Sequence, residues 1–402
     1  MPRTADYTIQ GFLYQFNKTA LEILKAQDDD TITVEGIVED IEIATPASQR
    51  LIQCKYHEAS KKFTPSTIYK PLLQMMAHFS KHPDIDICYI LFAHFSGIDT
   101  PPPTVGKKEF EVARASENPK LEKYIKALPS DINLDAFDAK FTMEFGPSYD
   151  EIVKQVGEAL EANGILAGDI ETLAYPNTIH RIATLSIKHD AAERRIKKKQ
   201  FLSELQRIRT TAISRWTLAL NTRKKLLEAR RKQLKDHLGK NARLRYFIID
   251  PASIEDYDAE IVLFIKDFID KYHFKPAHTE TPILCLCATR DEIQDIVGRL
   301  YKKDMVTEDG YIGGNFEESH FFRDPMPPKK IAAGKVQREF ALRILSWNDH
   351  GTVLNNRKCD DLFIIGEARY ELLDTADVNV EKFAGVTMKE MKYVTGVSNV
   401  CE

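Results

Sequence analysis

Residues 35–57 read Glu35-Gly-Ile-Val-Glu-Asp-Ile-Glu-Ile43, Ala44-Thr-Pro-Ala-Ser-Gln-Arg50 and Leu51-Ile-Gln-Cys-Lys-Tyr-His57. Short apolar runs on both sides of Thr45-Pro-Ala-Ser48 are typical of strands joined by a turn. We therefore expect strands over residues 32–39, 40–44 and 50–57. Because strand side chains two positions apart share a face, Gln53 and Lys55 are predicted to point the same way, with Cys54 directed into the core.

Helix and strand patterns extend this segment in both directions. Apolar residues recur at helical spacing from Tyr7 to Gln27, which predicts a helix before the first strand. After the strands we expect a helix over 64–81, a strand over 86–95, a short helix over 121–128, a strand over 141–145 and a helix over 149–162. This order of elements predicts an α/β/α sandwich.

The remaining sequence contains a helical stretch and a second α/β pattern. Residues 166–238 are mostly helical, and residues 200–238 fit one long helix. Beyond them, strands are expected over 246–249, 283–288, 340–346 and 362–365, with helices over 259–272 and 290–303. We therefore expect an α/β protein of three parts. These are a sandwich domain over 1–165, a basic helical linker or assembly segment over 166–241, and a smaller α/β domain over 242–402 that regulates the first or binds a partner.

The composition is typical of a globular protein. The 402 residues are 43% hydrophobic and 29% charged, and no apolar run of about 18 residues could cross a membrane. The first residues lack the apolar stretch of a secretory signal, and the six cysteines lack the paired spacing of a zinc site. We therefore expect a cytoplasmic protein with reduced cysteines.

Charge is distributed unevenly along the chain. Between Arg194 and Arg245 there are 18 lysines and arginines against three acids, a local excess of 15; since the whole chain carries −4, the rest carries −19. Such a stretch can contact the phosphates of a nucleic acid. It can also expose cations for solubility or pack against a partner subunit, and the salt dependence of DNA binding would separate these possibilities.

Asp40, Gln53 and Lys55 suit the hydrolysis of a phosphodiester. That reaction needs a divalent metal on a phosphate oxygen, carboxylates that hold the metal, and a cation that stabilises the developing charge. An acid on one strand, with an acceptor and then a lysine two residues apart on the next strand, can provide these groups. The alternative is a solvated sheet face with ordinary charges.

The pattern Asp40…Gln53-Cys54-Lys55, preceded by a helix that bears Glu22, resembles the PD-(D/E)xK nuclease superfamily in its D…QxK variant, as in Mrr-type restriction enzymes. The resemblance implies that Asp40 and Glu22 bind Mg²⁺ or Mn²⁺, with the backbone carbonyl of Cys54 as a further ligand. It also implies that Gln53 places the metal or water, and that Lys55 activates the nucleophile.

Other residues could complete or surround this site. Many relatives carry Glu at the position of Gln53, so this chain departs from them by one charge. The missing charge could come from Glu22 or from one of the acids Glu35, Glu39 and Glu42. Glu22 could instead be an ordinary helix surface residue. His57 follows on the Lys55 face and could touch phosphate or be structural. The basic candidates for DNA contact are Arg194, Lys197, Lys198 and Lys199.

A wider set of residues carries a narrower resemblance. Gly11-Phe-Leu-Tyr-Gln15, Glu39-Asp-Ile-Glu42 and Ile52-Gln-Cys-Lys-Tyr-His-Glu58 together resemble the endonuclease domain of antiphage effectors of the CBASS and Lamassu defence systems, over roughly residues 1–165. The remaining length and the basic helix favour the Lamassu nuclease subunit. That resemblance implies a double-stranded DNA substrate, an SMC-like ATPase and an accessory subunit as partners, and activity held off until release or homo-oligomerisation.

Two other functions remain open at this stage. A CBASS effector would carry a SAVED domain that binds a cyclic oligonucleotide, although no SAVED features are recognised after residue 166. A non-catalytic DNA-binding or scaffold subunit would retain the fold without the chemistry. In that protein, Lys55→Ala would change nothing except local stability.

Overall fold

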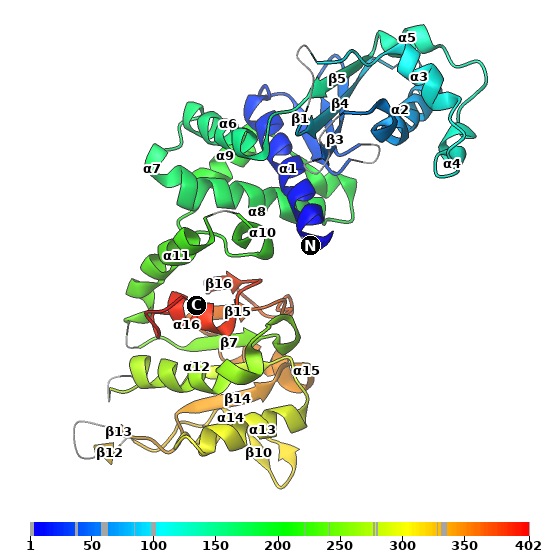
Figure 1. Ribbon diagram of the computed structural model, residues 1–402. Helices are drawn as coiled ribbons and strands as arrows, with labels where there is room; N and C mark the ends of the chain where they lie inside the picture. The colour runs from blue at the N-terminus through cyan, green and yellow to red at the C-terminus, as the bar shows by residue number, and fades with distance from the viewer. Residues whose placement is uncertain are drawn as a thin grey trace. The chain divides into compact units, whose positions relative to one another are not determined.

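The computed structural model describes residues 4–36, 39–57, 63–83, 85–97, 102–220, 222–240, 242–275, 278, 280–327, 329–330 and 336–401. The chain forms two compact units, Met1–Arg209 and Thr210–Glu402. Each unit combines one six-stranded sheet with helices (Figure 1), which confirms the predicted α/β class. No helix in the described ranges combines the length and apolar character that a membrane crossing needs.

The first unit contains a mixed sheet with the strand order β5-β4-β3-β2-β1-β6. Strands β1, β2 and β3 are antiparallel, β3, β4 and β5 are parallel, and β6 pairs antiparallel with β1. The bounds are β1 Thr31–Val34, β2 Ile41–Ala44, β3 Gln49–His57, β4 Ile87–Phe95, β5 Phe141–Phe145 and β6 Arg195–Ile196. The predicted turn closes the β2–β3 hairpin, because Thr45 N donates to the Ser48 carbonyl at 2.9 Å.

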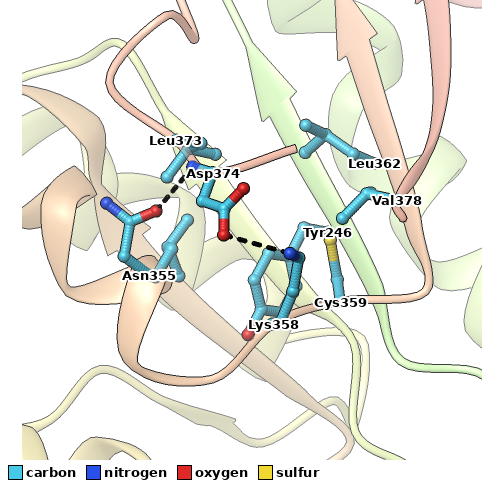
Figure 2. A pocket seen from close by; sticks show the side chains of 9 residues that line it. Tyr246, Asn355, Lys358, Cys359, Leu362, Leu373, Asp374 and Val378 are labelled. Carbon is cyan, nitrogen blue, oxygen red and sulfur yellow. Dashed lines mark hydrogen bonds and ion pairs between the residues drawn. The ribbon is translucent and has the colours of Figure 1, made fainter. Parts of the chain in front are cut away.

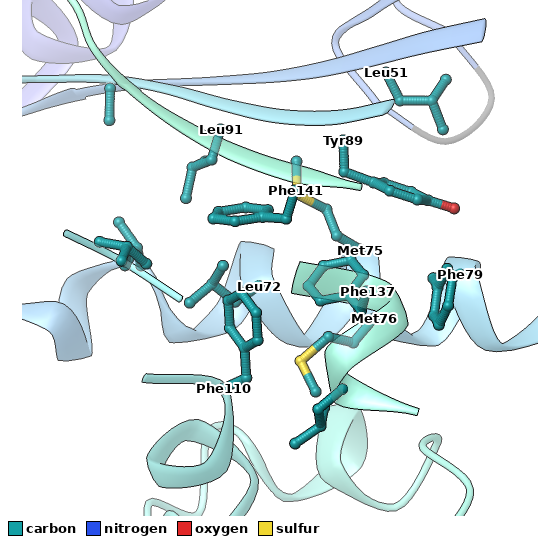
Figure 3. Packing of buried hydrophobic residues seen from close by; sticks show 14 of the residues in the cluster. Leu51, Leu72, Met75, Met76, Phe79, Tyr89, Leu91, Phe110, Phe137 and Phe141 are labelled. Atoms are coloured by element: carbon teal, nitrogen blue, oxygen red, sulfur yellow. The ribbon is translucent and has the colours of Figure 1, made fainter. Parts of the chain in front are cut away.

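Helices cover both faces of this sheet. On one face, Leu51, Tyr89 and Leu91 pack against α2 and its neighbours, with Met75 and Phe137 among the buried partners (Figure 3). On the other face lies α1, which also packs against α6, α8 and α9. The bounds are α1 Thr4–Lys25, α2 Tyr69–Lys81, α3 Lys107–Arg114, α4 Glu122–Ile125, α5 Leu134–Asp138, α6 Tyr149–Ala162, α7 Ala167–Asp169, α8 Tyr175–Ser186 and α9 Lys198–Arg207.

The second unit contains a parallel sheet with the strand order β16-β15-β7-β8-β14-β9. The bounds are β7 Arg245–Ile249, β8 Ile283–Leu286, β9 Thr307–Glu308, β14 Leu342–Ser346, β15 Asp361–Ile365 and β16 Asn379–Phe383. Tyr246 and Ile248 join one core cluster, whereas Phe247 packs on Phe264 and Phe268 of α12. Both faces of β7 are therefore buried, which explains its continuous apolar run.

Helices and short hairpins complete the second unit. The helices are α10 Arg215–Leu218, α11 Arg223–Leu238, α12 Tyr257–Tyr272, α13 Arg290–Tyr301, α14 Glu318–Phe321, α15 Trp347–His350 and α16 Met388–Val394. The hairpins pair β10 Tyr311–Ile312 with β11 Asn315–Phe316, and β12 Lys329–Lys330 with β13 Val336–Gln337. The small helices α10, α14, α15 and α16 were not predicted from the sequence.

The predicted long helix over 200–238 is wrong. Helix α9 ends at Arg207, and α11 begins only at Arg223. The chain changes units within this stretch: α9 packs on α1, whereas Ile213 forms a bridge with Phe383 of β16. The predicted middle segment is accordingly shared, with residues up to Arg209 in the first unit and those from Thr210 in the second.

Four of the 18 cations of the basic stretch pair with acids of the second unit. Arg230 is buried and pairs with Glu381, and Arg223 pairs with Glu390 at 2.7 Å. Arg243 and Arg245 both pair with buried Asp361, at 2.6 and 3.6 Å, and lie outside α11. A buried arginine without a partner acid would be strongly destabilising. These four cations are therefore neutralised within the fold.

A small cavity in the second unit is lined by side chains from β7, β15 and the loops around them (Figure 2). Its volume is about 20 Å³, room for one water molecule. Asp374 ties the surrounding loops together, because its carboxylate pairs with Lys358 at 3.0 Å and its N–H donates to Asn355 at 2.8 Å. The cavity is too small to be a ligand site.

Candidate active site

The acids of the candidate site flank the loop between β1 and β2. Glu35 N donates to the Asp40 carbonyl at 2.8 Å, so these two residues face each other across the start and end of the loop. Asp40 thus precedes β2 instead of belonging to it as predicted. The predicted strand over 32–39 also stops early, at Val34, and Ile37 and Val38 lie outside the described residues.

Two features shape this loop. Glu35 adopts a φ of 48°, in the left-handed region that residues with a side chain rarely occupy. The next residue, Gly36, lies against Glu42, and a Cβ at this position would collide with the Glu42 side chain. A glycine is therefore required here for close approach. The Glu42 side chain thus lies beside the loop, and since Asp40 precedes β2, the two residues do not share one strand as predicted.

Strand β3 extends beyond its neighbour β2, and Asp40 binds the exposed edge. The β2 pairing covers only Gln49–Ile52. At the next positions, Cys54 N donates to Asp40 Oδ2 at 2.7 Å, and Gln53 Nε2 donates to the same oxygen. The N–H and C=O of one strand residue point to the same side, so the Cys54 carbonyl also faces this open edge.

Burial and mutual repulsion raise the pKa values of the acids. Burial raises the pKa of Asp40, opposed by attraction to Lys55 and by the two hydrogen bonds it accepts. Burial and the Asp40 charge raise the pKa of Glu35, and the same causes raise the pKa of Glu39 to about 8. Several carboxyl groups therefore lie close together where water has little access. A cation bound there would favour their ionised forms.

Glu35 is held by groups from two distant parts of the chain. Gln15 of α1 donates from Nε2 to Glu35 Oε1 at 2.7 Å. Arg194, 159 residues further along the sequence, donates from a terminal nitrogen to the Glu35 carbonyl. The Nε of Arg194 is buried without a hydrogen-bond partner among the described residues. Side chain and backbone of Glu35 are therefore fixed separately.

Glu22 lies on the other side of β3. Its carboxylate pairs with Lys18 at 2.8 Å and with Arg50 at 3.3 Å. Arg50 and Gln53 are an odd number of positions apart on β3, so their side chains point to opposite faces. Among the described residues, the contacts of Glu22 thus belong to a partly buried ion-pair network that does not include Asp40 or Lys55.

His57 and the basic candidates lie in different settings. The His57 ring stacks on Phe95 at 4.8 Å, and burial lowers its pKa, which favours the neutral imidazole. Strand β6 brings the segment Arg194–Lys199 beside β1, through the pair Ile196–Ile32. Lys197 and Lys199 are exposed and Lys198 is half-buried at the start of α9. Glu58, quoted above with His57, lies outside the described residues.

The donor set fits a magnesium ion with water ligands. Within the described ranges, no three His, Cys, Asp or Glu side chains are gathered closely enough to hold a metal alone. Mg²⁺, however, usually takes one or two carboxylates and keeps several waters. Asp40 and Glu35 supply carboxylates, Gln53 retains its amide oxygen, and the Cys54 carbonyl faces the same edge. All of these are the oxygen ligands that Mg²⁺ or Mn²⁺ prefers.

Sequence reasoning missed two of these relationships. In the sequence, Gln15 stands out only as part of a motif, and Arg194 only as a cation. The one available signal for Glu35 was the following glycine, since Glu-Gly after a strand favours a loop. No sequence signal pairs Arg194 with Glu35, because that contact depends on β6, a strand of two residues.

No family model matches the chain, and no curated protein matches its sequence. Among solved structures, it is similar to an Acinetobacter baumannii Cap4 SAVED/CARF-domain containing receptor with the cyclic trinucleotide 2′3′3′-cAAA, at 13% identity and a TM-score of 0.31, over 82% of this chain and 68% of that one. For the same receptor with 3′3′3′-cAAA, the identity is 11% and the TM-score 0.30, over 97% of this chain and 93% of that one. For a Moraxella osloensis Cap4 SAVED/CARF-domain containing receptor, the identity is 10% and the TM-score 0.25, over 100% of this chain and 95% of that one. These TM-scores are too low to support an inference about fold or function.

Proposed function

We propose that the first unit is a metal-dependent endonuclease that hydrolyses phosphodiesters of double-stranded DNA. The observation that carries this proposal is the binding of Asp40 at the open edge of β3. There its Oδ2 accepts from both Gln53 and Cys54, with Lys55 on the same strand face as Gln53. Glu35 stands opposite Asp40 across the loop.

Each residue has a role that follows from its contacts. Asp40 and Glu35 would hold Mg²⁺ or Mn²⁺, with the Cys54 carbonyl as a backbone ligand. When bound, such an ion polarises a phosphate oxygen and lowers the pKa of a water. Gln53 holds Asp40 in orientation through its amide N–H. Lys55, half-buried on the same face, offsets the negative charge of the acids and can hold the attacking water or stabilise charge on phosphate.

We propose that this nuclease is an effector of antiphage defence. The resemblance of residues 1–165 to effector nucleases supports it, as does the second, separate unit, which provides a place for control. If the chain is the nuclease subunit of a Lamassu system, an SMC-like ATPase and an accessory subunit release its activity. Copies of the chain then assemble so that two active sites cut both DNA strands. A dilute single copy that cuts duplex DNA at full rate would contradict this control.

A second candidate is an effector gated by a cyclic oligonucleotide, as in CBASS. The favouring observation is the parallel sheet of the second unit, in which the strand order reverses between β7 and β15. Ligands of open parallel sheets bind at the carboxyl ends of strands at such a point. There Gly366, with a φ of 81°, lies so close to Ser253 that a Cβ would not fit.

Plasmid cleavage with Mg²⁺ tests the proposal on the full chain. Wild type, Asp40→Ala and Lys55→Ala are each assayed alone, with a cyclic trinucleotide, and with an SMC-like ATPase and accessory subunit. Cleavage that disappears in both variants supports the nuclease, and the addition that releases it identifies the mode of control. A wild type that binds DNA but never cuts it would replace the nuclease with a scaffold subunit.

A further inference from the structure

Glu35 adopts a backbone conformation that is unfavourable for a residue with a side chain. It is one of three non-glycine residues with a positive φ among the described residues, the others being Asp304 and Asp377. Such a conformation is unfavourable for an L-residue and persists where the surroundings impose it. Two side chains and one backbone bond impose it here, from Gln15, Arg194 and Asp40.

The Arg194 backbone is fixed on both sides of the residue. Before it, Asp190 Oδ1 accepts from Ala192 N at 2.8 Å and starts the short helix Ala191–Arg194. After it, Arg195 and Ile196 form β6 on the edge of β1. An anchored guanidinium therefore reaches the carbonyl of Glu35 at the end of β1. Since this bond fixes the peptide plane after Glu35, it fixes the direction in which the Glu35 side chain leaves the loop.

We infer that Arg194 is a positioning residue that holds Glu35 as the second carboxylate of the metal site, so that the site is complete only with the segment Ala191–Lys199. The inference rests on the proposed function. Gln15 holds the Glu35 carboxylate and Arg194 holds its backbone. Without Arg194, the loop can relax toward negative φ, which turns the carboxylate away from Asp40. The positive charge of Arg194 acts in the same direction, because it lowers the pKa of Glu35 against the effect of burial.

The site is therefore built from two distant parts of the sequence. Residues 1–57 supply the acids, Gln53 and Lys55, while the support for Glu35 lies beyond the expected end of the nuclease domain at residue 165. From Lys198 the same segment continues as α9 to Arg207, two residues before the boundary between the units. A change in this segment can thus alter the metal site without touching a metal ligand.

Metal binding by the full chain tests this inference directly. Mn²⁺ affinity is measured by electron paramagnetic resonance, and plasmid cleavage is measured as a function of Mg²⁺. We expect Arg194→Ala to weaken Mn²⁺ binding by about 10- to 100-fold, the usual effect of removing a group that orients a ligand. Cleavage at saturating Mg²⁺ should recover to within a few-fold of wild type. Arg194→Lys keeps one donor and should restore part of the affinity.

Arg195→Ala is the matched control. It removes the same charge from the neighbouring, exposed position of β6. We expect it to leave the Mn²⁺ affinity within two- to three-fold of wild type. In a Glu35→Gln background, Arg194→Ala should have no further effect on Mn²⁺ binding, because the group it positions is already lost. A general loss of folding would weaken Mn²⁺ binding in the Glu35→Gln background as well, so this comparison separates it from a positioning effect.

The outcomes separate this inference from the nuclease itself. If the wild type cuts DNA and Arg194→Ala binds Mn²⁺ as well as Arg195→Ala does, Arg194 has no positioning role and the nuclease stands. If the wild type binds Mn²⁺ in an Arg194-dependent way but never cuts DNA, the nuclease fails and the positioning role stands. A wild type without Mn²⁺ binding overturns the inference.

Discussion

The backbone N–H of Cys54 donates a hydrogen bond to Oδ2 of Asp40 at 2.7 Å, at the point where β3 continues beyond β2. A side chain here takes the place of a neighbouring strand. The carboxylate satisfies a backbone donor that would otherwise be left unpaired, and we propose the same residue as a metal ligand. Stability and chemistry are therefore linked at Asp40, and substitutions can separate them.

Asp40→Asn and Asp40→Ala should differ in stability and agree in activity. Asn retains an oxygen that can accept from Cys54, whereas Ala leaves this donor and the Gln53 amide unpaired, which costs about 1–3 kcal/mol. Both remove the carboxylate, and we expect cleavage to fall at least 100-fold in each. Urea unfolding and plasmid cleavage measure the two effects. Normal cleavage by Asp40→Asn would exclude Asp40 as the metal ligand.

Gln53→Glu should exchange stability for metal affinity. The Gln53 amide donates to Asp40, and a Glu in its place would direct a second carboxylate at the first. Without metal, we expect a loss of roughly 1–3 kcal/mol in the free energy of unfolding from unpaired, repelling acids. Saturating Mg²⁺ should recover this loss, since a ligand that binds the folded state stabilises it. Thermal unfolding in EDTA and in Mg²⁺ gives both values, with Gln53→Ala as the control that lacks the new charge.

The apolar elements of the fold were predictable and its polar contacts were not. β4 (Ile87–Phe95) and α6 (Tyr149–Ala162) carry clear strand and helix periodicity, and the structure confirms them. β16 (Asn379–Phe383) was missed because three of its five residues are polar, and its buried Glu381 pairs with Arg230 and accepts a hydrogen bond from Asn379. Periodicity reports apolar burial, so a strand stabilised by a buried ion pair gives little signal.

The geometry around the candidate site was predictable in part for the same reason. The spacing of Gln53 and Lys55 on β3 was correct because side-chain alternation on a strand is geometric. The position of Asp40 just before β2 depends on the closure of the loop by Glu35, whose positive φ no local pattern announces. The surroundings of Glu22 depend on Lys18 and Arg50 meeting across α1 and β3, which is a tertiary contact.

Glu22→Gln decides whether this acid is catalytic or structural. Its carboxylate is 8% exposed and pairs with Lys18 and Arg50. Breaking this partly buried network should lower the free energy of unfolding by about 1–3 kcal/mol, while Mn²⁺ affinity stays within two- to three-fold of wild type. Glu35→Gln is the matched comparison and should show the reverse pattern. Lost Mn²⁺ binding at unchanged stability in Glu22→Gln would place Glu22 in the metal site.

Glu39→Gln should change the pH dependence of stability. Burial and the Asp40 charge raise the pKa of Glu39 from 4.5 to about 8 in the folded protein. A raised carboxyl pKa means that the folded state binds the proton more tightly, so this contribution to stability is full below about pH 4 and is lost as the pH rises toward 8. The shift corresponds to at most about 5 kcal/mol.

The amide introduced by Glu39→Gln carries no charge at any of these pH values. In EDTA, we expect this variant to be more stable than wild type near pH 8.5, by at least about 1 kcal/mol, with the difference shrinking as the pH falls toward 4. Urea unfolding across this range measures it, and Glu42→Gln serves as a control from the adjoining strand. A constant difference at all pH values would show that the Glu39 pKa is not raised.

DNA binding should depend on the cations near β6 more than on those of α11. Lys197 and Lys199 are exposed beside the strand that leads to Glu35. Each phosphate contact contributes about 0.9 to the slope of log K against log salt. Combined Lys197→Ala, Lys198→Ala and Lys199→Ala should therefore reduce the magnitude of the slope by roughly 1–3.

The control is a triple variant of α11. Lys224→Ala, Lys232→Ala and Lys235→Ala remove the same charge from exposed positions of α11. Fluorescence anisotropy with a DNA duplex over a range of salt gives both slopes. An equal reduction in both triple variants would mean that DNA responds to the overall charge of the chain, and a larger reduction in the α11 variant would move the DNA-binding surface to the second unit.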